Sequence, residues 1–238
     1  MFAQATTRRN PDSDEFIAEA SSRLVDHSRI VEVERLSSEQ VKKHPGYLAV
    51  KRVFDVVASA IALILLAIPM AIVAIRIKLD SPGPVFYVQE RLGKGGKPFK
   101  LVKFRTMRID AEAEGAQWAM NDDPRVTPFG RKLRSSRFDE TPQFWGVIKG
   151  DLSLVGPRPE RGVFYREFNK YIHGFEQRLM VRPGITGLAQ VNGGYDLLPE
   201  KKIVYDLEYI KSASIPVDLK ILFKTVGVVL GGASKGAR

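Results

Sequence analysis

The sequence predicts an α+β fold that is mostly helical and attached to a membrane, and three observations lead to this. A run of 20 residues, 56–75, carries no charged side chain. As a helix it would be about 30 Å long, enough to cross the hydrocarbon core of a bilayer. The glycine-rich stretch 93–96 separates two strand-like segments, 85–88 and 99–104, which is typical of a small β-hairpin. Amphipathic helical stretches fill most of the remainder, and we expect 217–230 to lie at lipid headgroups.

This pattern divides the chain into three regions. Residues 1–48 form an N-terminal extension that is partly disordered, with short amphipathic helices and no catalytic signal. Residues 49–80 form the membrane helix, and residues 81–238 form the catalytic domain. Beyond the hairpin, helical periodicity predicts helices over 109–120, 129–133, 143–149, 161–178 and 199–211.

The composition narrows the chemistry that the chain can perform. There is no cysteine, which excludes disulfides, thiolate metal sites and cysteine nucleophiles, and the three histidines are too scattered for a zinc site. The net charge is +10, and the surplus follows residue 50, where 30 Lys and Arg stand against 19 Asp and Glu. A basic body implies an anionic partner: nucleic acid, lipid headgroups or a phosphorylated substrate. We expect no nucleic acid partner, because the sequence has no nucleic-acid-binding motif.

The membrane helix is predicted to be re-entrant. Pro69 lies inside the apolar run, where it removes a backbone donor and bends or breaks a helix. Cations flank the run on both sides, Lys51 and Arg52 before it and Arg76 and Lys78 after it. Because cations favour the cytosolic side of a membrane, both ends are expected there, and the helix is expected to bend at Pro69. The alternatives are an ordinary span that tolerates a proline and a buried core helix.

An adjacent pair of carboxylates, Asp139 and Glu140, is the candidate catalytic site. One carboxylate can attack phosphorus or hold a metal while nearby cations neutralise phosphate oxygens, so a pair among cations suits chemistry on a phosphate. Thr141-Pro142 predicts that a helix begins directly after the pair. The alternative is therefore a solvated, charged helix end with Asp139 as its cap. The cations near the pair in sequence are Arg131, Lys132, Arg134, Arg137 and Lys149.

A series of short motifs follows in a fixed order along the chain. They are Lys51-Arg52-Val53-Phe54-Asp55, Pro82-Gly83-Pro84-Val85-Phe86, Lys103-Phe104-Arg105-Thr106-Met107, Asp123-Pro124-Arg125-Val126-Thr127, Leu133-Arg134, Asp139-Glu140 with Pro142-Gln143, Gly150-Asp151-Leu152-Ser153-Leu154-Val155-Gly156-Pro157-Arg158-Pro159 and Arg182-Pro183-Gly184-Ile185-Thr186-Gly187-Leu188-Ala189-Gln190. In this order they resemble the bacterial sugar transferases, the monotopic polyprenol-phosphate phosphoglycosyl transferases. The resemblance covers about residues 49–231, and the chain is similar to the minimal catalytic form with an N-terminal extension.

The resemblance implies a reaction and a place in the cell. Such enzymes transfer a sugar-1-phosphate from a UDP-sugar to a polyprenyl phosphate, usually undecaprenyl phosphate, and release UMP. The implied route has a covalent aspartyl-phosphosugar intermediate and uses Mg²⁺, with Asp139 matching the nucleophile and Glu140 the metal partner. The implied role is to initiate an exopolysaccharide, capsule or other surface glycan. The implied location is the bacterial inner membrane, with the catalytic domain on its cytoplasmic face and the lipid bilayer as a partner.

The resemblance also assigns substrate-binding positions. Basic positions around the phosphates correspond to Lys103, Arg105, Arg134 and Arg158. Further substrate-binding positions correspond to Gln190 and Asp206, and Pro69 corresponds to the proline of the membrane bend. Two departures stand out. Ile68 precedes Pro69 where the family often has serine, and Thr141 follows the carboxylate pair where leucine is common.

Two rival functions stay open at this point. A membrane-attached, metal-dependent phosphohydrolase would use Asp139 in the same way, with water as the final acceptor. A basic module that binds nucleic acid at a membrane would not be an enzyme. No residue decides which sugar is transferred or which glycan is made, although we favour a simple hexose. The role of residues 1–48 and a homodimer are likewise undecided by the sequence.

Overall fold

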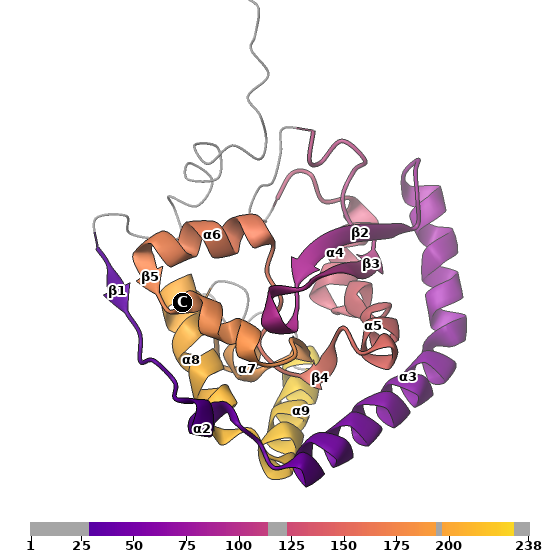
Figure 1. The fold of residues 1–238 in the computed structure, drawn as a ribbon. Helices are drawn as coiled ribbons and strands as arrows, with labels where there is room; N and C mark the ends of the chain where they lie inside the picture. Colours follow the sequence, from indigo (N-terminus) through magenta and orange to yellow (C-terminus); the bar gives the residue numbers. More distant parts are fainter. Residues whose placement is uncertain (1–28, 114–122, 194–196, 231–238) are drawn as a thin grey trace, which may run out of the picture.

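The computed structural model describes residues 29–113, 123–193 and 197–230, so the first part of the N-terminal extension, where we expect disorder, lies outside the described residues. The predicted α+β fold, mostly helical, is confirmed (Figure 1). The 3₁₀ segments of the described ranges are η1 (Lys94–Gly96), η2 (Phe138–Glu140) and η3 (Phe175–Met180). The strands and α-helices are β1 (Val31–Glu32), α2 (Ser38–Val41), α3 (Pro45–Asp80), β2 (Phe86–Leu92), β3 (Pro98–Phe104), α4 (Pro128–Ser135), α5 (Gln143–Lys149), β4 (Ser153–Val155), α6 (Gly162–Tyr171), β5 (Ile172–His173), β6 (Gly184–Thr186), α7 (Leu188–Gly193), α8 (Pro199–Ser212) and α9 (Ile215–Leu230).

The apolar run lies in α3, which follows α2 after a turn at 42–44. Within the described ranges this is the one helix long and apolar enough to cross a membrane, and little of its apolar stretch is buried. A buried core helix is therefore not what the structure contains. The helix continues through Pro69 rather than ending there, and Figure 1 shows that its ribbon changes direction along its length. Re-entry into the membrane stays a prediction.

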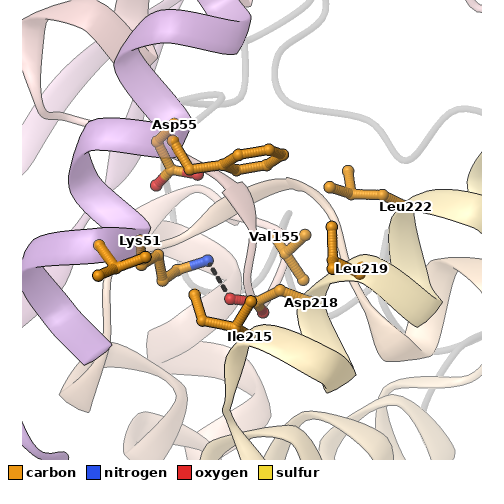
Figure 2. A pocket seen from close by; sticks show the side chains of 9 residues that line it. Lys51, Asp55, Val155, Ile215, Asp218, Leu219 and Leu222 are labelled. Carbon is orange, nitrogen blue, oxygen red and sulfur yellow. Dashed lines mark hydrogen bonds and ion pairs between the residues drawn. The ribbon is translucent and has the colours of Figure 1, made fainter. Parts of the chain in front are cut away.

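The N-terminal half of α3 is tied to the rest of the body by buried polar contacts. The Lys51 ammonium forms an ion pair with Asp218 of α9 at 2.9 Å, beside a small apolar cavity of about 50 Å³ (Figure 2). Asp55 accepts hydrogen bonds from the Ser153 hydroxyl at 2.7 Å and from a backbone N–H of β4. The Arg52 guanidinium donates to two carbonyls near the end of α5. These contacts fix α3 relative to β4, α5 and α9.

The C-terminal half of α3 packs against the same body. Ile77 is buried in one cluster with Phe104 of β3 and Leu133 of α4. The Arg76 guanidinium lies over the ring of Phe129, 5.7 Å from its centre. Both halves of the apolar helix are therefore attached to one body, and the elements they contact include α4 and α5, which flank the carboxylate pair.

The predicted hairpin is confirmed. Strands β2 and β3 are antiparallel, and η1 with Gly95 and Gly96 in the left-handed region closes the turn. Tyr87 lies opposite Lys103 in the register. Because side chains alternate between the faces of a strand, these two share one face while Phe104 points to the other, into the core.

Two short parallel strand pairs were not predicted. Strand β4 pairs with β6, and β1 of the N-terminal extension pairs with β5. Strands of two or three residues are too short for an alternating pattern to appear in the sequence. At the C-terminal end of β4 the backbones of the two paired segments come very close, since a Cβ atom on Gly184 would lie 2.1 Å from the backbone nitrogen of Gly156.

The long helix predicted over 161–178 is wrong in its second half. Helix α6 ends at Tyr171, because Ile172 leaves the helical conformation and, as part of β5, pairs with Val31; Gly174, with φ 103°, then turns the chain into η3. The aromatic residues of this stretch pack in the core, as expected, including Phe168 and Phe175. The helix predicted over 109–120 begins as turns over 109–113, and the rest lies outside the described residues. Helices α4, α5, α8 and α9 agree with prediction to within two residues at most ends.

Candidate active site

The carboxylate pair lies in η2, between α4 and α5. Arg137, directly before it, has φ 59°, which is uncommon for a side chain with a Cβ and turns the backbone sharply into η2. Asp139 is 4% exposed and Glu140 is 8% exposed, so the solvated helix end considered from the sequence is excluded. Pro142 occupies the N-cap position of α5 without a side-chain cap, so Asp139 does not cap that helix.

Glu140 is held by Arg158, which follows β4. The two Arg158 nitrogens donate to the two Glu140 oxygens at 2.5 and 3.2 Å, a bidentate geometry that is strong for this type of pair. Burial alone would raise the pKa of Glu140, but Arg158, together with Arg137 and Lys103, outweighs it and lowers the pKa to about 2. Glu140 is therefore an anion at neutral pH, and its position is fixed from a second segment of the chain.

Asp139 has the opposite electrostatic behaviour. Burial and then the neighbouring Glu140 raise the pKa of its carboxyl to about 6, while Lys103, Arg134 and Arg158 pull it down. Its Oδ1 atom is buried and has no hydrogen-bond partner. A buried, unpaired carboxylate oxygen costs free energy, and in native proteins it calls for a specific explanation. An anion that is weakly solvated and surrounded by cations is suited to attack an electrophile.

Two further cations reach the pair from other elements, Lys103 from far away in sequence and Arg134 from the helix just before the pair. Lys103 comes from β3, and its ammonium lies over the ring of Tyr87, 5.3 Å from the ring centre. Burial lowers the pKa of Lys103 to about 8, although Asp139 counteracts this. Arg134 comes from α4, where its Nε atom donates to the Thr106 hydroxyl at 2.9 Å. The sequence-predicted Lys103, Arg134 and Arg158 are thus brought together around Asp139.

Asp206 lies one layer further back. The Arg178 Nε atom donates to Asp206 at 2.6 Å, and a second nitrogen of Arg178 donates to the backbone carbonyl of Arg158 at 2.8 Å. Both side chains are essentially inaccessible to solvent. Asp206 on α8 therefore positions Arg178, which in turn hydrogen-bonds to the backbone of Arg158, the partner of Glu140.

Two other expected substrate-binding residues have different surroundings. Arg105 donates to the carbonyls of Ser81 and Pro82, so it braces the loop after the membrane helix. Gln190 on α7 donates to the Ile185 carbonyl at 3.0 Å, and its Oε1 atom is buried without a partner. Within the described residues, neither side chain hydrogen-bonds to the carboxylate pair. Their proposed roles in substrate binding stay predictions.

A second charged cluster, which was not predicted from the sequence, lies behind the site. Glu160 pairs with Arg91 at 3.2 Å and with Lys202 at 3.1 Å, and these cations hold the pKa of this buried carboxyl at about 2 against the effect of burial. Arg91 shares the Tyr87 face of β2, which period-two alternation along 86–92 would have indicated. Of the cations near the pair in sequence, Lys149 pairs with Asp151 instead.

The carboxylate pair fits Mg²⁺ only together with a substrate. In the described part of the chain no three Asp, Glu or His side chains gather as a metal cluster. Mg²⁺ binds through one or two carboxylates and takes its other oxygens from waters and substrate phosphates. The unpaired Oδ1 of Asp139 and the Glu140 carboxylate are hard oxygen donors of that kind. The residues therefore fit an ion that arrives with a diphosphate.

Comparison with known proteins gives the family. The model of the family described as "Bacterial sugar transferase" matches residues 46–232, which is most of the chain. The chain belongs to the bacterial sugar transferase family. Every residue of the site described above lies inside the matched region, whereas β1, α2 and the segment between them precede it.

Curated bacterial sugar transferases are similar to this chain over three quarters of its length. A UDP-N-acetylgalactosamine-undecaprenyl-phosphate N-acetylgalactosaminephosphotransferase of Aeromonas hydrophila is 45% identical over 79% of the chain. Two UDP-glucose:undecaprenyl-phosphate glucose-1-phosphate transferases are each 42% identical: that of Escherichia coli over 74% of the chain and that of Caulobacter vibrioides over 76%. The chain spans 45% of the first protein, 39% of the second and 69% of the third. The names include an N-acetylated sugar and a hexose, so the preference for a hexose stays untested.

Proposed function

We propose that this protein transfers a sugar-1-phosphate from a UDP-sugar to undecaprenyl phosphate or a similar polyprenyl phosphate and releases UMP. The observation that carries the proposal is the buried Asp139 with an unpaired oxygen, set among Lys103, Arg134 and Arg158. The names of the similar sugar transferases supply the substrate classes. Such a reaction initiates a surface glycan on the cytoplasmic face of the bacterial inner membrane.

Asp139 is the proposed nucleophile. Its carboxylate oxygen attacks the phosphorus that carries the sugar, and the bond from that phosphorus to the bridging oxygen breaks, so UMP leaves with the electron pair. A phosphate oxygen of the polyprenyl acceptor then attacks the same phosphorus, and the bond to Asp139 breaks and restores the carboxylate. Glu140 is the poorer candidate, because Arg158 occupies both of its oxygens and keeps its pKa low.

The cations offset the repulsion between a diphosphate and a carboxylate. Lys103 and Arg134 are positioned by Tyr87 and Thr106, so they need little reorganisation when phosphate oxygens arrive. We propose Mg²⁺ as the cofactor, with Glu140 and the free lone pairs of Asp139 as the ligands that this chain would offer. When bound, the ion would neutralise charge on the diphosphate.

A re-entrant α3 accounts for how the site reaches a lipid-borne phosphate. Its two halves contact the same catalytic body, through Asp55 on one side of the apolar run and Ile77 on the other. A helix with its ends on opposite sides of a bilayer could not make both sets of contacts. Between them, Ile64, Leu65 and Ile68 are 72–75% exposed, which suits contact with acyl chains.

The first experiment traps the covalent intermediate. The purified protein in detergent is incubated with a UDP-sugar labelled in the sugar, without acceptor, and is analysed by intact mass. We expect an added sugar phosphate on the wild type, stoichiometric UMP, and no adduct with Asp139→Asn. Asp151→Asn is the matched control, because it removes a partly exposed acid that pairs with Lys149, and it should leave the adduct intact. An adduct on Asp139→Asn would refute the assignment.

The second experiment separates transfer from hydrolysis. When undecaprenyl phosphate is added, a transferase yields a lipid-linked sugar diphosphate, whereas a phosphohydrolase yields free sugar phosphate with or without the lipid. We expect the lipid-linked product, and expect EDTA to abolish its formation and added Mg²⁺ to restore it. Full turnover in EDTA would overturn the role of the metal without affecting the assignment of Asp139.

Cysteine labelling tests the course of α3. The chain has no native cysteine, so single cysteines at positions 45 and 80 can be probed in intact cells with a membrane-impermeant maleimide. If the helix re-enters, both positions react only after the inner membrane is opened. Reaction of one position in intact cells and of the other only after opening would show an ordinary span.

A further inference from the structure

The segment that precedes the family match, 30–41, is docked on the catalytic body. We call it the strap. Its β1 pairs in parallel with β5, Val31 opposite Ile172. Leu36 is 8% exposed and belongs to the core cluster of α6, η3 and α8. Ion pairs at the edge join Arg35 to Glu176 and Lys211 to Glu34.

A single buried amide joins the strap to η3. The Gln177 Oε1 atom accepts from the backbone N–H of Leu36 at 2.7 Å, and its Nε2 atom donates to the carbonyl of Glu34 at 3.0 Å. This side chain pairs with the strap as a neighbouring strand would, and it is 1% exposed. Below it, Leu36 packs in one cluster with Phe175, the first residue of η3.

Arg178, which follows Gln177 in η3, supports the active site. Arg178 lies over the ring of Phe175, 4.7 Å from its centre, and reaches Asp206 and the backbone carbonyl of Arg158. A continuous set of contacts, buried as far as Arg178 and partly buried beyond it, therefore runs from Leu36 through η3 to Arg158 and Glu140. Because η3 is a 3₁₀ segment, whose helical hydrogen bonds have poorer geometry than those of an α-helix, it depends on side-chain partners for its position.

We infer that the strap is a positioning element of the active site: by clamping η3 it holds Arg178, and through Arg178 it sets the position of Arg158 against Glu140. The inference rests on the proposed function only for its effect on turnover, since the physical coupling exists whatever the reaction is. It assigns a role to residues before the family match, where the sequence showed no catalytic signal.

The variants act on the strap and leave η3 unchanged. Leu36→Asp places a charge in the core cluster and should release the strap, whereas Leu36→Met keeps an apolar side chain of similar volume. Val33→Pro is a milder second variant, because it buries no charge: it removes the N–H that donates to the His173 carbonyl at 3.3 Å and replaces a side chain at the edge of the core cluster. Arg35→Ala is the matched control, since it removes an exposed ion pair of the same strap.

Hydrogen exchange of the full-length protein, followed by mass spectrometry, measures the coupling without reference to any reaction. With Leu36→Asp, and to a lesser degree Val33→Pro, we expect faster exchange in peptides covering 156–160 and 138–141, as well as in the strap and η3. Leu36→Met and Arg35→Ala should match the wild type. Faster exchange confined to 30–41 and 172–180 would overturn the inference, because the strap would then be a local stabiliser only.

Kinetics supply the second reading. We expect Leu36→Asp to raise the KM for the UDP-sugar and to lower kcat/KM by about tenfold at a temperature where the protein is fully folded, with Arg35→Ala within about twofold. A loss of folded protein alone would lower the apparent kcat and leave KM unchanged, and that result would contradict the inference. If the wild type turns over no UDP-sugar, the proposed function fails, while the exchange experiment still decides the role of the strap.

Discussion

At the scale of single residues, the surroundings of Asp139, the proposed nucleophile, imply a cost in stability. Its pKa is raised from 3.8 to about 6, chiefly by burial. A carboxyl whose pKa is higher in the folded state contributes stability below its unfolded pKa, and this contribution is lost as the pH rises through the folded value. Above pH 6 the ionised Asp139 therefore destabilises the fold.

Asp139→Asn should thus abolish turnover and stabilise the protein at the same time. At pH 8 we expect a gain of about 1–3 kcal/mol in the free energy of unfolding, because the amide carries no buried charge next to Glu140. At pH 4 the gain should largely vanish. Thermal unfolding in EDTA at the two pH values measures this. An equal difference between variant and wild type at both values would show that the charge on Asp139 is not the cause.

Arg137 offers a way to separate backbone strain from charge. Its φ of 59° suits glycine, and its guanidinium also lowers the pKa of Glu140. Arg137→Gly should recover about 1 kcal/mol of backbone strain, whereas Arg137→Ala loses the charge and keeps the strain. Chemical denaturation of the two variants measures the difference directly. If Ala and Gly were equally stable, this conformation would not be strained.

At the scale of elements, the parallel pairing of β4 with β6 leaves no room for a side chain at Gly184. A Cβ atom at position 184 would meet the Gly156 backbone nitrogen at 2.1 Å, and backbone cannot move aside cheaply. Gly184→Ala should cost roughly 2–4 kcal/mol and should reduce activity, because Arg158 lies three residues after the end of β4. Gly227→Ala on α9 is the control, since a Cβ there meets nothing within 4 Å. Unfolding midpoints of both variants test this.

The secondary-structure elements also show which parts of the fold can be predicted from the sequence. Helix α5 and the hairpin are predictable because their signals are local: a proline before Gln143 and a glycine turn at 93–96. The predicted helix over 161–178 is too long, because the helical periodicity continues past Tyr171 and does not reveal that Ile172 pairs with the distant Val31. The pairing of β4 with β6 depends on residues about 30 positions apart, and no local pattern reports such a contact.

The candidate site likewise has residues that the sequence indicates and residues whose roles depend on contacts formed on folding. The carboxylate pair and Arg158 stand out from charge and from motif order, and the structure brings them together with Lys103 and Arg134. The positioning role of Arg178 could not be predicted, because it depends on which backbone carbonyl its guanidinium reaches after folding. The charged groups of a site can be identified from a sequence, but the residues that position them depend on how the chain packs.

At the scale of the whole molecule, both halves of α3 are attached to a single body, through Asp55 near one end and Ile77 near the other. On the re-entrant course proposed above, such a helix would enter one leaflet only and would not have to match the full thickness of the bilayer. Hydrophobic mismatch, which tilts or strains an ordinary span when the bilayer is too thick or too thin, then has little to act on.

The protein should therefore tolerate bilayers of different thickness. Reconstituted in vesicles of phosphatidylcholine with acyl chains of about 14 to 22 carbons, its turnover should vary by less than about threefold. A protein with a true spanning helix, assayed in the same vesicles, is the comparison, and a sharp optimum at one chain length would indicate a span. Such indifference to thickness would let one enzyme work alike in thin and thick regions of the same membrane, wherever its lipid acceptor collects.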